Sequence, residues 1–156
     1  MKKTSFIFKI TLGTYLLFTI FALFLYNRPV SSLPLIQYIQ VFSNIIPFKT
    51  FVEYINLLSV GQIEIQYIFL QILPNILLFL PLGILIPLCF DKFKSLKTML
   101  TLISCFFIIE ICQLFFKIGS FDIDDIILYF CGMILGYSVY RLISKYILNR
   151  QTKEII

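Results

Sequence analysis

The chain has 156 residues, of which 60% are hydrophobic and only 13% are charged, and its mean hydropathy is +0.96. Soluble domains carry about 25% charged residues, so this chain has too little polar surface to cover a water-soluble globule. Length and composition therefore predict one integral membrane domain, 1–156, and leave no room for a second, soluble one.

The formal net charge is +5, and the chain contains no histidine. In a soluble protein this charge would suggest nucleic acid, but here the lysines and arginines flank apolar runs, which is typical of cytoplasmic span ends. We therefore predict no nucleic-acid partner. The lack of histidine excludes imidazole metal sites and serine–histidine catalysis. The four cysteines lie inside apolar runs without a CxxC pair, so we predict neither a metal nor a cofactor.

Four apolar runs are long enough to cross a hydrocarbon core of about 30 Å, which takes about 20 residues. They are 6–26, 67–90, 98–116 and 126–148. We therefore predict an all-α, polytopic membrane helix bundle with four transmembrane helices. The first run exceeds a typical signal-peptide core and no A-x-A-like cleavage site follows it, so we favour an uncleaved anchor over a signal peptide.

The link between the first two runs is long for an unstructured loop. Within it, "FVEYINLL" places Phe51, Tyr54, Ile55 and Leu58 on one helical face. The stretch "LIQYIQVF" forms a second, weaker amphipathic piece. We expect interfacial or re-entrant segments at about 35–60, in the first extracellular link and on the outer surface of the bilayer.

The second run contains "PNILLFLPLG", in which Asn75 is a polar residue among apolar ones and Gly83 lies two turns further on. Pro74 and Pro81 remove backbone donors, so we expect this helix to bend. The bend would free carbonyl groups that neighbouring side chains or water must satisfy.

The third run contains "EICQLFFK", in which Glu110 and Gln113 are three residues apart and Lys117 is four further on. These residues share one helical face. A carboxylate inside an apolar run costs at least a few kcal/mol unless it is paired, protonated or close to water. Two interpretations of Glu110 therefore stay open: it has a functional role, or it pairs with Lys117 for structural reasons.

The fourth run follows three aspartates and carries polar and small residues on one face. The members of this stripe are Asp122, Asp125, Tyr129, Gly132, Gly136 and Tyr140. The sequence "GMILG" is a GxxxG motif, which lets a neighbouring helix approach closely in lipid. We therefore expect Gly132 and Gly136, together with Gly83 of the second run, to pack helices. For Asp122 and Asp124, capping of the helix is the alternative to a functional role.

Basic residues concentrate near both chain ends and in the link between the second and third runs, so both termini are expected in the cytoplasm. The links 27–66 and 117–125 are then outside. Most acidic residues, including Glu110 and the three aspartates of 122–125, fall on or near this outer side. We expect polar groups from three helices to meet in one pocket that opens outward.

Four motifs occur in an order that resembles the VanZ-like family, from about Ser43 to Gly136. They are "SNIIPF", "NILLFLPLG", "EICQ" and "FDIDDIILYFCGMILG". The resemblance implies a small multi-span bacterial membrane protein, which in some members lowers susceptibility to teicoplanin-type glycopeptides. Carried over by motif, the characteristic polar positions are Asn44, Asn75, Glu110, Gln113, Asp122 and Asp125. Many relatives have asparagine in place of Tyr129 and arginine in place of Gly119.

The first functional hypothesis is a non-enzymatic, multi-pass protein of the bacterial cytoplasmic membrane. Its outer-leaflet polar site would recognise a lipid headgroup or a lipid-linked wall precursor and so alter glycopeptide action. Besides the lipid bilayer, a homo-oligomer or a partner membrane protein is left open as a partner.

Two alternatives belong to other classes of protein. One is an enzyme acting on a lipid-linked envelope substrate, with Glu110 and Asp125 as acid and base, or holding a divalent cation together with Asp122. The other is a structural subunit whose face of Gly132 and Gly136 binds a helix of a partner.

Overall fold

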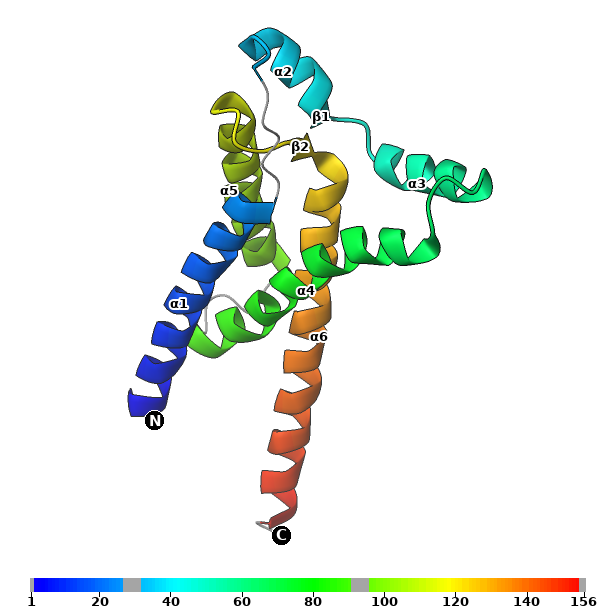
Figure 1. Cartoon of the computed structure of the whole chain (residues 1–156). Coiled ribbons are helices and arrows are strands. Elements are labelled where there is room, and N and C mark those ends of the chain that lie inside the picture. The colour runs from blue at the N-terminus through cyan, green and yellow to red at the C-terminus, as the bar shows by residue number, and fades with distance from the viewer. Residues whose placement is uncertain (1, 27–31, 91–95, 155–156) are drawn as a thin grey trace.

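The computed structural model describes residues 2–26, 32–90 and 96–154. These residues are mainly helical, and Figure 1 shows how the elements are arranged. The elements are α1 (Lys2–Tyr26), α2 (Leu35–Phe42), β1 (Ser43–Asn44), α3 (Lys49–Ser59), α4 (Ile65–Cys89), α5 (Leu96–Phe115), β2 (Phe121–Asp122) and α6 (Ile123–Glu154). The beginning of α1 and the end of α6 lie at one end of the molecule, and α2, β1 and β2 lie at the other (Figure 1).

Three of the described helices are long and apolar enough to cross a membrane, by length and composition. They are Phe6–Phe24 of α1, Ile65–Cys89 of α4 and Ile123–Tyr146 of α6. The fourth expected span, 98–116, coincides with α5, whose described apolar part is Leu100–Phe115. These residues extend only about 24 Å, less than the thickness of the hydrocarbon core, because a helix rises 1.5 Å per residue.

Helices α4 and α6 approach each other closely where glycines remove the side chains between them. A Cβ added at Gly132 or Gly136 would lie 2.3 or 1.9 Å from a backbone carbonyl oxygen of α4. One added at Gly83 would lie 2.2 Å from the carbonyl oxygen of Met133 in α6. The structure therefore places the GxxxG face against a helix of the same chain.

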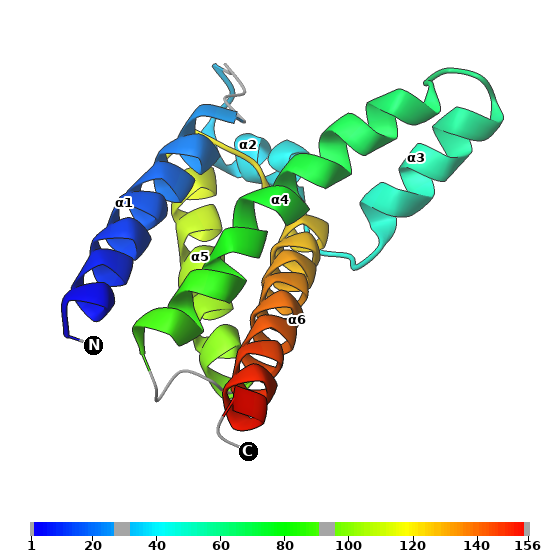
Figure 2. The ribbon, with the colours of Figure 1, turned by 90° about the horizontal axis from the view of Figure 1, so that it is seen from below.

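The core lies among α1, α4, α5 and α6, which Figure 2 shows side by side. Phe79 of α4 is fully buried, stacks on Tyr129 with ring centroids 4.0 Å apart, and meets Phe106 edge-on at 4.6 Å. Helix α1 packs against α4, where the Tyr15 hydroxyl donates to the Leu78 carbonyl at 3.1 Å. Side chains of α1, among them Leu12, complete this core.

The segment 35–60 forms two helices, α2 and α3, joined through β1. Helix α3 and the first turns of α4 form a hairpin that projects from the other helices (Figure 2). Tyr54 and Tyr67 meet edge-on across this hairpin, with ring centroids 6.1 Å apart. The hairpin exposes large apolar side chains such as Val52 and Ile55. Its interfacial or re-entrant placement in a bilayer stays a prediction.

A short parallel pairing joins this link to the last helix, and the all-α expectation did not include it. Ser43 of β1 pairs with Phe121 of β2, and Asn44 pairs with Asp122. Two-residue strands have no detectable alternation of polar and apolar residues, so hydrophobic periodicity gives no signal for them. The pairing fixes the link beside the start of α6 and thereby positions the site.

Candidate functional site: two adjoining polar cavities

Asp122 connects the link to the start of α6. Asn44 donates through Nδ2 to Asp122 Oδ1 at 3.0 Å, and the Thr50 hydroxyl donates to Asp122 Oδ2 at 2.6 Å. The backbone N–H of Asp124 also donates to Asp122 Oδ1, at 2.8 Å. Asp122 is thus both the N-terminal cap of α6 and the anchor of the link.

Asp124 caps a different helix from its own. Its side chain is 1% exposed, and its two carboxylate oxygens accept hydrogen bonds from the backbone N–H groups of Phe48 and Thr50. Helix α3 begins at Lys49, immediately after Phe48, whose φ of +66° is left-handed. The first N–H groups of a helix have no partner within it, and its dipole favours negative charge there. Asp124 therefore supplies the N-terminal cap that α3 lacks locally.

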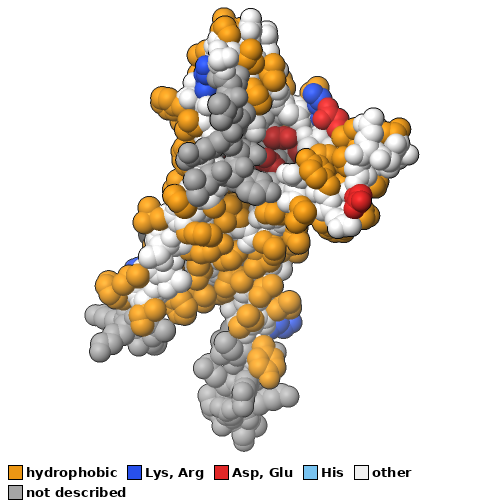
Figure 3. All heavy atoms as spheres, in the orientation of Figure 1, with side chains coloured by type: hydrophobic (Ala, Val, Ile, Leu, Met, Phe, Trp, Pro, Cys, Tyr) orange, Lys and Arg blue, Asp and Glu red, His pale blue; other side chains and the backbone are white. Residues whose placement is uncertain are grey.

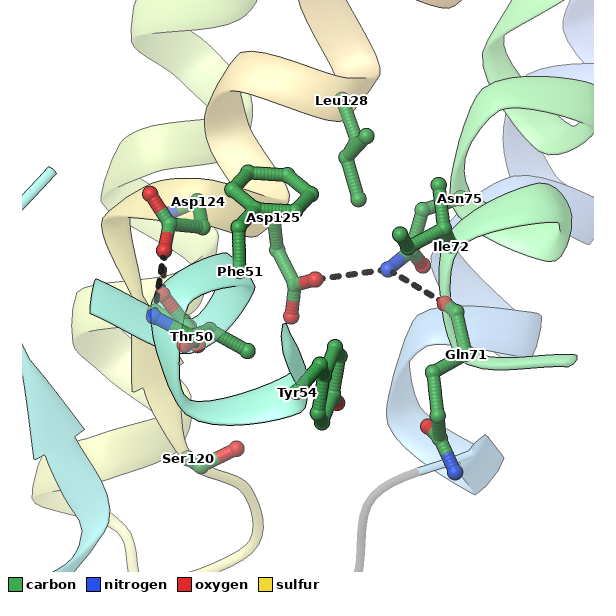
Figure 4. A pocket seen from close by; sticks show the side chains of 11 residues that line it. Thr50, Phe51, Tyr54, Gln71, Ile72, Asn75, Ser120, Asp124, Asp125 and Leu128 are labelled. Atoms are coloured by element: carbon green, nitrogen blue, oxygen red, sulfur yellow. Dashed lines mark hydrogen bonds between the residues drawn. The ribbon is translucent and has the colours of Figure 1, made fainter. Parts of the chain in front are cut away.

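Asp125 forms its side-chain hydrogen bond with α4. Asn75 donates through Nδ2 to Asp125 Oδ1 at 2.6 Å, and the same nitrogen lies 3.4 Å from the Gln71 carbonyl oxygen (Figure 4). Successive aspartates on α6 thus bind different elements, Asp124 the start of α3 and Asp125 the middle of α4.

Glu110 lies deeper, where α5 faces α6. Its side chain is 4% exposed, and the Tyr129 hydroxyl donates to Glu110 Oε1 at 2.6 Å. One interpretation of the sequence was that Glu110 pairs with Lys117. In the structure, Lys117 Nζ instead donates to the Leu33 carbonyl at 2.7 Å. The buried carboxylate is therefore held by a neutral hydroxyl group rather than by that lysine.

An outer cavity of about 180 Å³ opens at the end of the molecule where α3 meets α6 (Figure 4). Its polar lining comes from the link, α4 and the start of α6, and comprises Thr50, Tyr54, Gln71, Asn75, Ser120, Asp122, Asp124 and Asp125. Figure 3 shows acidic side chains recessed at this end, above a surface that is largely hydrophobic. Within the part of the chain that the structure describes, three carboxylates but no lysine or arginine line this cavity, so it favours cationic or hydrogen-bond-donating groups.

An inner cavity of about 130 Å³ adjoins the outer one, because Asn75 and Ser120 line both. Its other polar residues are Glu110, Gln113 and Tyr129, and its apolar wall comes from α1 and α4. Gln113 is 3% exposed, and its Nε2 has no hydrogen-bond acceptor among the described residues. A buried donor without an acceptor is uncommon and calls for an explanation.

The structure brings the six sequence-predicted polar positions together around these cavities. Asn75, Asp122 and Asp125 line the outer one, Asn44 holds Asp122, and Glu110 and Gln113 line the inner one with Asn75. Sequence reasoning missed Thr50 and Ser120, because single hydroxyl residues in a link carry no pattern. Tyr129 was noted on the stripe of α6 but not as the partner of Glu110.

The divalent-cation alternative gains no support from the described residues. Within 2–26, 32–90 and 96–154, no three Cys, Asp or Glu side chains are placed to hold a metal ion together. The three carboxylates that this alternative named, Asp122, Asp125 and Glu110, each accept a hydrogen bond from another side chain of the protein.

Replacing Tyr129 with phenylalanine should lower the free energy of unfolding by about 1–3 kcal/mol, because the buried carboxylate of Glu110 loses its donor. The ring and its stacking on Phe79 are kept. Thermal unfolding of the purified protein in detergent measures the change. Tyr146→Phe, on the exposed part of the same helix, is the matched control and should leave stability unchanged. Equal effects of the two substitutions would contradict the proposed importance of this hydrogen bond.

Comparison with known proteins agrees with the motif order. The sequence profile of the VanZ/LLP1 family matches residues 8–144. "Protein VanZ" of Enterococcus faecium is 28% identical over 88 residues, which are 56% of this chain and 55% of that protein. This chain thus matches about half the length of that relative, and no solved structure matches it. Since the family match covers most of the chain and every residue of both cavities, the chain belongs to the VanZ/LLP1 family.

Proposed function

We propose that this protein acts in the bacterial cytoplasmic membrane and lowers susceptibility to teicoplanin-class glycopeptides. Its two polar cavities recognise a lipid or a wall precursor at the outer leaflet. The observation that carries the proposal is the convergence of Asn75 from α4, Glu110 from α5 and Asp125 from α6 on adjoining cavities. Ionised groups rarely enter apolar helices without such a shared polar environment.

A topology of four spans, with α5 as the additional span and both termini inside, is part of the proposal. It is supported by the basic residues near both chain ends, which favour the cytoplasm. It is also supported by the position of β2, which lies at the end of the molecule opposite the start of α1 and the end of α6 (Figure 1), because Asp122 of β2 lines the outer cavity. In this topology the outer cavity faces the side where glycopeptides act.

The test is expression in a glycopeptide-sensitive bacterium, with susceptibility to teicoplanin and vancomycin measured against an empty vector. The wild-type chain should raise the teicoplanin concentration that inhibits growth. Asp125→Asn should weaken ligand binding by about tenfold or more and return susceptibility towards the empty-vector level. The reason is that a carboxylate that accepts hydrogen bonds is replaced by an amide of nearly the same shape.

Glu64→Gln is the matched control, because Glu64 is exposed and lines neither cavity. It should behave as the wild type does. Membrane levels of each variant must be equal for the comparison to hold. If Asp125→Asn protected the host as well as the wild type, the carboxylate would have no part in the function. If the wild type shifted neither drug, the proposed link to glycopeptides would be wrong.

A further inference from the structure

The inner cavity has a polar end and an apolar wall, which is the pattern of a site for an amphiphile. Glu110, Gln113 and Tyr129 lie at the polar end. Ala22 of α1 and Leu78 of α4 contribute to the apolar wall. Because α1 is itself apolar enough to cross a membrane, this wall belongs to the part of the protein that lipid chains surround.

Among the described residues that line the inner cavity, one buried side-chain nitrogen has no hydrogen-bond partner. Tyr129 donates to Glu110 Oε1, and Asn75 donates to Asp125 Oδ1, so both of these donors have an acceptor within the protein. The buried Gln113 Nε2 has no acceptor among the described residues, although Gln113 lines the cavity. Leaving a buried donor unpaired costs free energy, so an acceptor atom supplied by a ligand would be stabilised there.

Charge restricts what the head of the ligand can be. Among the described residues, neither lysine nor arginine lines the inner cavity, whereas Glu110 does. An anionic phosphate would therefore meet a carboxylate and no cation from this part of the chain. An ammonium group would suit Glu110 but offers no lone pair to Gln113. A hydroxyl group both accepts and donates, so it fits the two residues together.

Size restricts the head further. The cavity of about 130 Å³ is slightly smaller than the cavity of about 150 Å³ that accepts benzene in a protein interior. It can hold a hydroxyl group with the first few carbons of a chain, but not a complete sugar diphosphate.

We propose that the inner cavity binds the hydroxyl end of a lipid alcohol, with Gln113 donating to its oxygen and the chain passing along Ala22 and Leu78. This inference deepens the proposed function and rests on it for the biological role of the cavity. It assigns the ligand to the uncharged lipid alcohols, rather than to lipid phosphates or amines.

The experiment uses the full chain, purified in detergent, and a hexadecanol analogue that carries a photoreactive diazirine near its hydroxyl end. Unlabelled hexadecanol, hexadecyl phosphate and hexadecylamine compete with the probe. Hexadecanol should compete about tenfold more strongly than either charged analogue, because only the hydroxyl group satisfies both Gln113 and Glu110. The labelled peptide should contain residues that line the cavity, such as Glu110 and Gln113 of α5 or Leu78 of α4.

Two variants test the cavity directly. Gln113→Leu keeps the approximate volume and should weaken competition by hexadecanol roughly 2- to 10-fold, as the loss of one hydrogen bond does. Ala22→Phe should abolish labelling, because the ring fills the cavity. Leu17→Phe is the matched control on the exposed face of α1 and should label as the wild type does.

Equal competition by hexadecyl phosphate, or unchanged binding by Gln113→Leu, would overturn the inference. So would full labelling of folded Ala22→Phe. Gln113→Leu keeps the test decisive if Ala22→Phe fails to fold. If the labelling experiment contradicts this inference, the proposed function still holds when Asp125→Asn alters teicoplanin susceptibility. The susceptibility measurement does not depend on which lipid is bound.

Discussion

Replacing Gly136 with leucine is expected to lower the free energy of unfolding by about 3 kcal/mol or more. A Cβ at this position would lie 1.9 Å from the carbonyl oxygen of Leu80 and 2.9 Å from its carbonyl carbon. These are backbone atoms, which cannot rotate away as a side chain would, so α4 and α6 must separate. Thermal unfolding of the purified protein in detergent, followed by circular dichroism, measures the loss.

Gly13 provides a matched control, since it also lies within a helix and has no atom within 4 Å of an added Cβ. Leucine favours a helix over glycine by about 1 kcal/mol, so Gly13→Leu should be neutral or slightly stabilising. If the two substitutions changed stability equally, the close contact between α4 and α6 would not be a main source of stability.

Replacing Asp124 with alanine is expected to release the beginning of α3. The carboxylate accepts hydrogen bonds from the backbone N–H groups of Phe48 and Thr50. Hydrogen bonds to a charged group contribute about 1.5–3 kcal/mol each, so the loss should be about 3 kcal/mol or more. Hydrogen exchange followed by mass spectrometry should show about 100-fold faster exchange of these two amides.

Asp125→Ala is the control, because it also removes one negative charge from the start of α6 but leaves the hydrogen bonds of Asp124 to α3 intact. Asp125 lies next to Asp124 in the sequence but binds Asn75 of α4. Its removal should leave the exchange of the Phe48 and Thr50 amides unchanged. If those amides exchanged in Asp124→Ala as slowly as in the wild type, the start of α3 would not depend on this carboxylate.

Hydropathy was sufficient to locate the long helices. Each of the four apolar runs coincides with a helix, because a membrane helix must satisfy its own backbone groups and cover itself with apolar side chains. The number of spans was harder to predict, since α5 has only 16 residues, Leu100–Phe115, in its described apolar stretch. The VanZ-like family was identified from the order of short motifs, and the family match confirms it.

The hydrogen-bond partners within the site were less predictable than the residues that form it. Polar residues in apolar runs, such as Asn75 and Glu110, stood out because lipid makes them costly. Their partners did not stand out. Asp124 looked like a cap of its own helix, because local spacing cannot indicate that a helix 74 residues earlier lacks a cap. Tyr129 gave no signal as the partner of Glu110, since tyrosines are common in apolar helices.

The pairing of β1 with β2 has a consequence for the order in which the chain matures. The link that contains Asn44 and Thr50 is synthesised long before Asp122 and Asp124, the residues that hold it. During translation this link therefore has none of these partners until the start of α6 leaves the ribosome. A nascent chain that ends after α5 lacks both Asp122 and Asp124, which bind the link. The outer cavity is therefore among the last features to form.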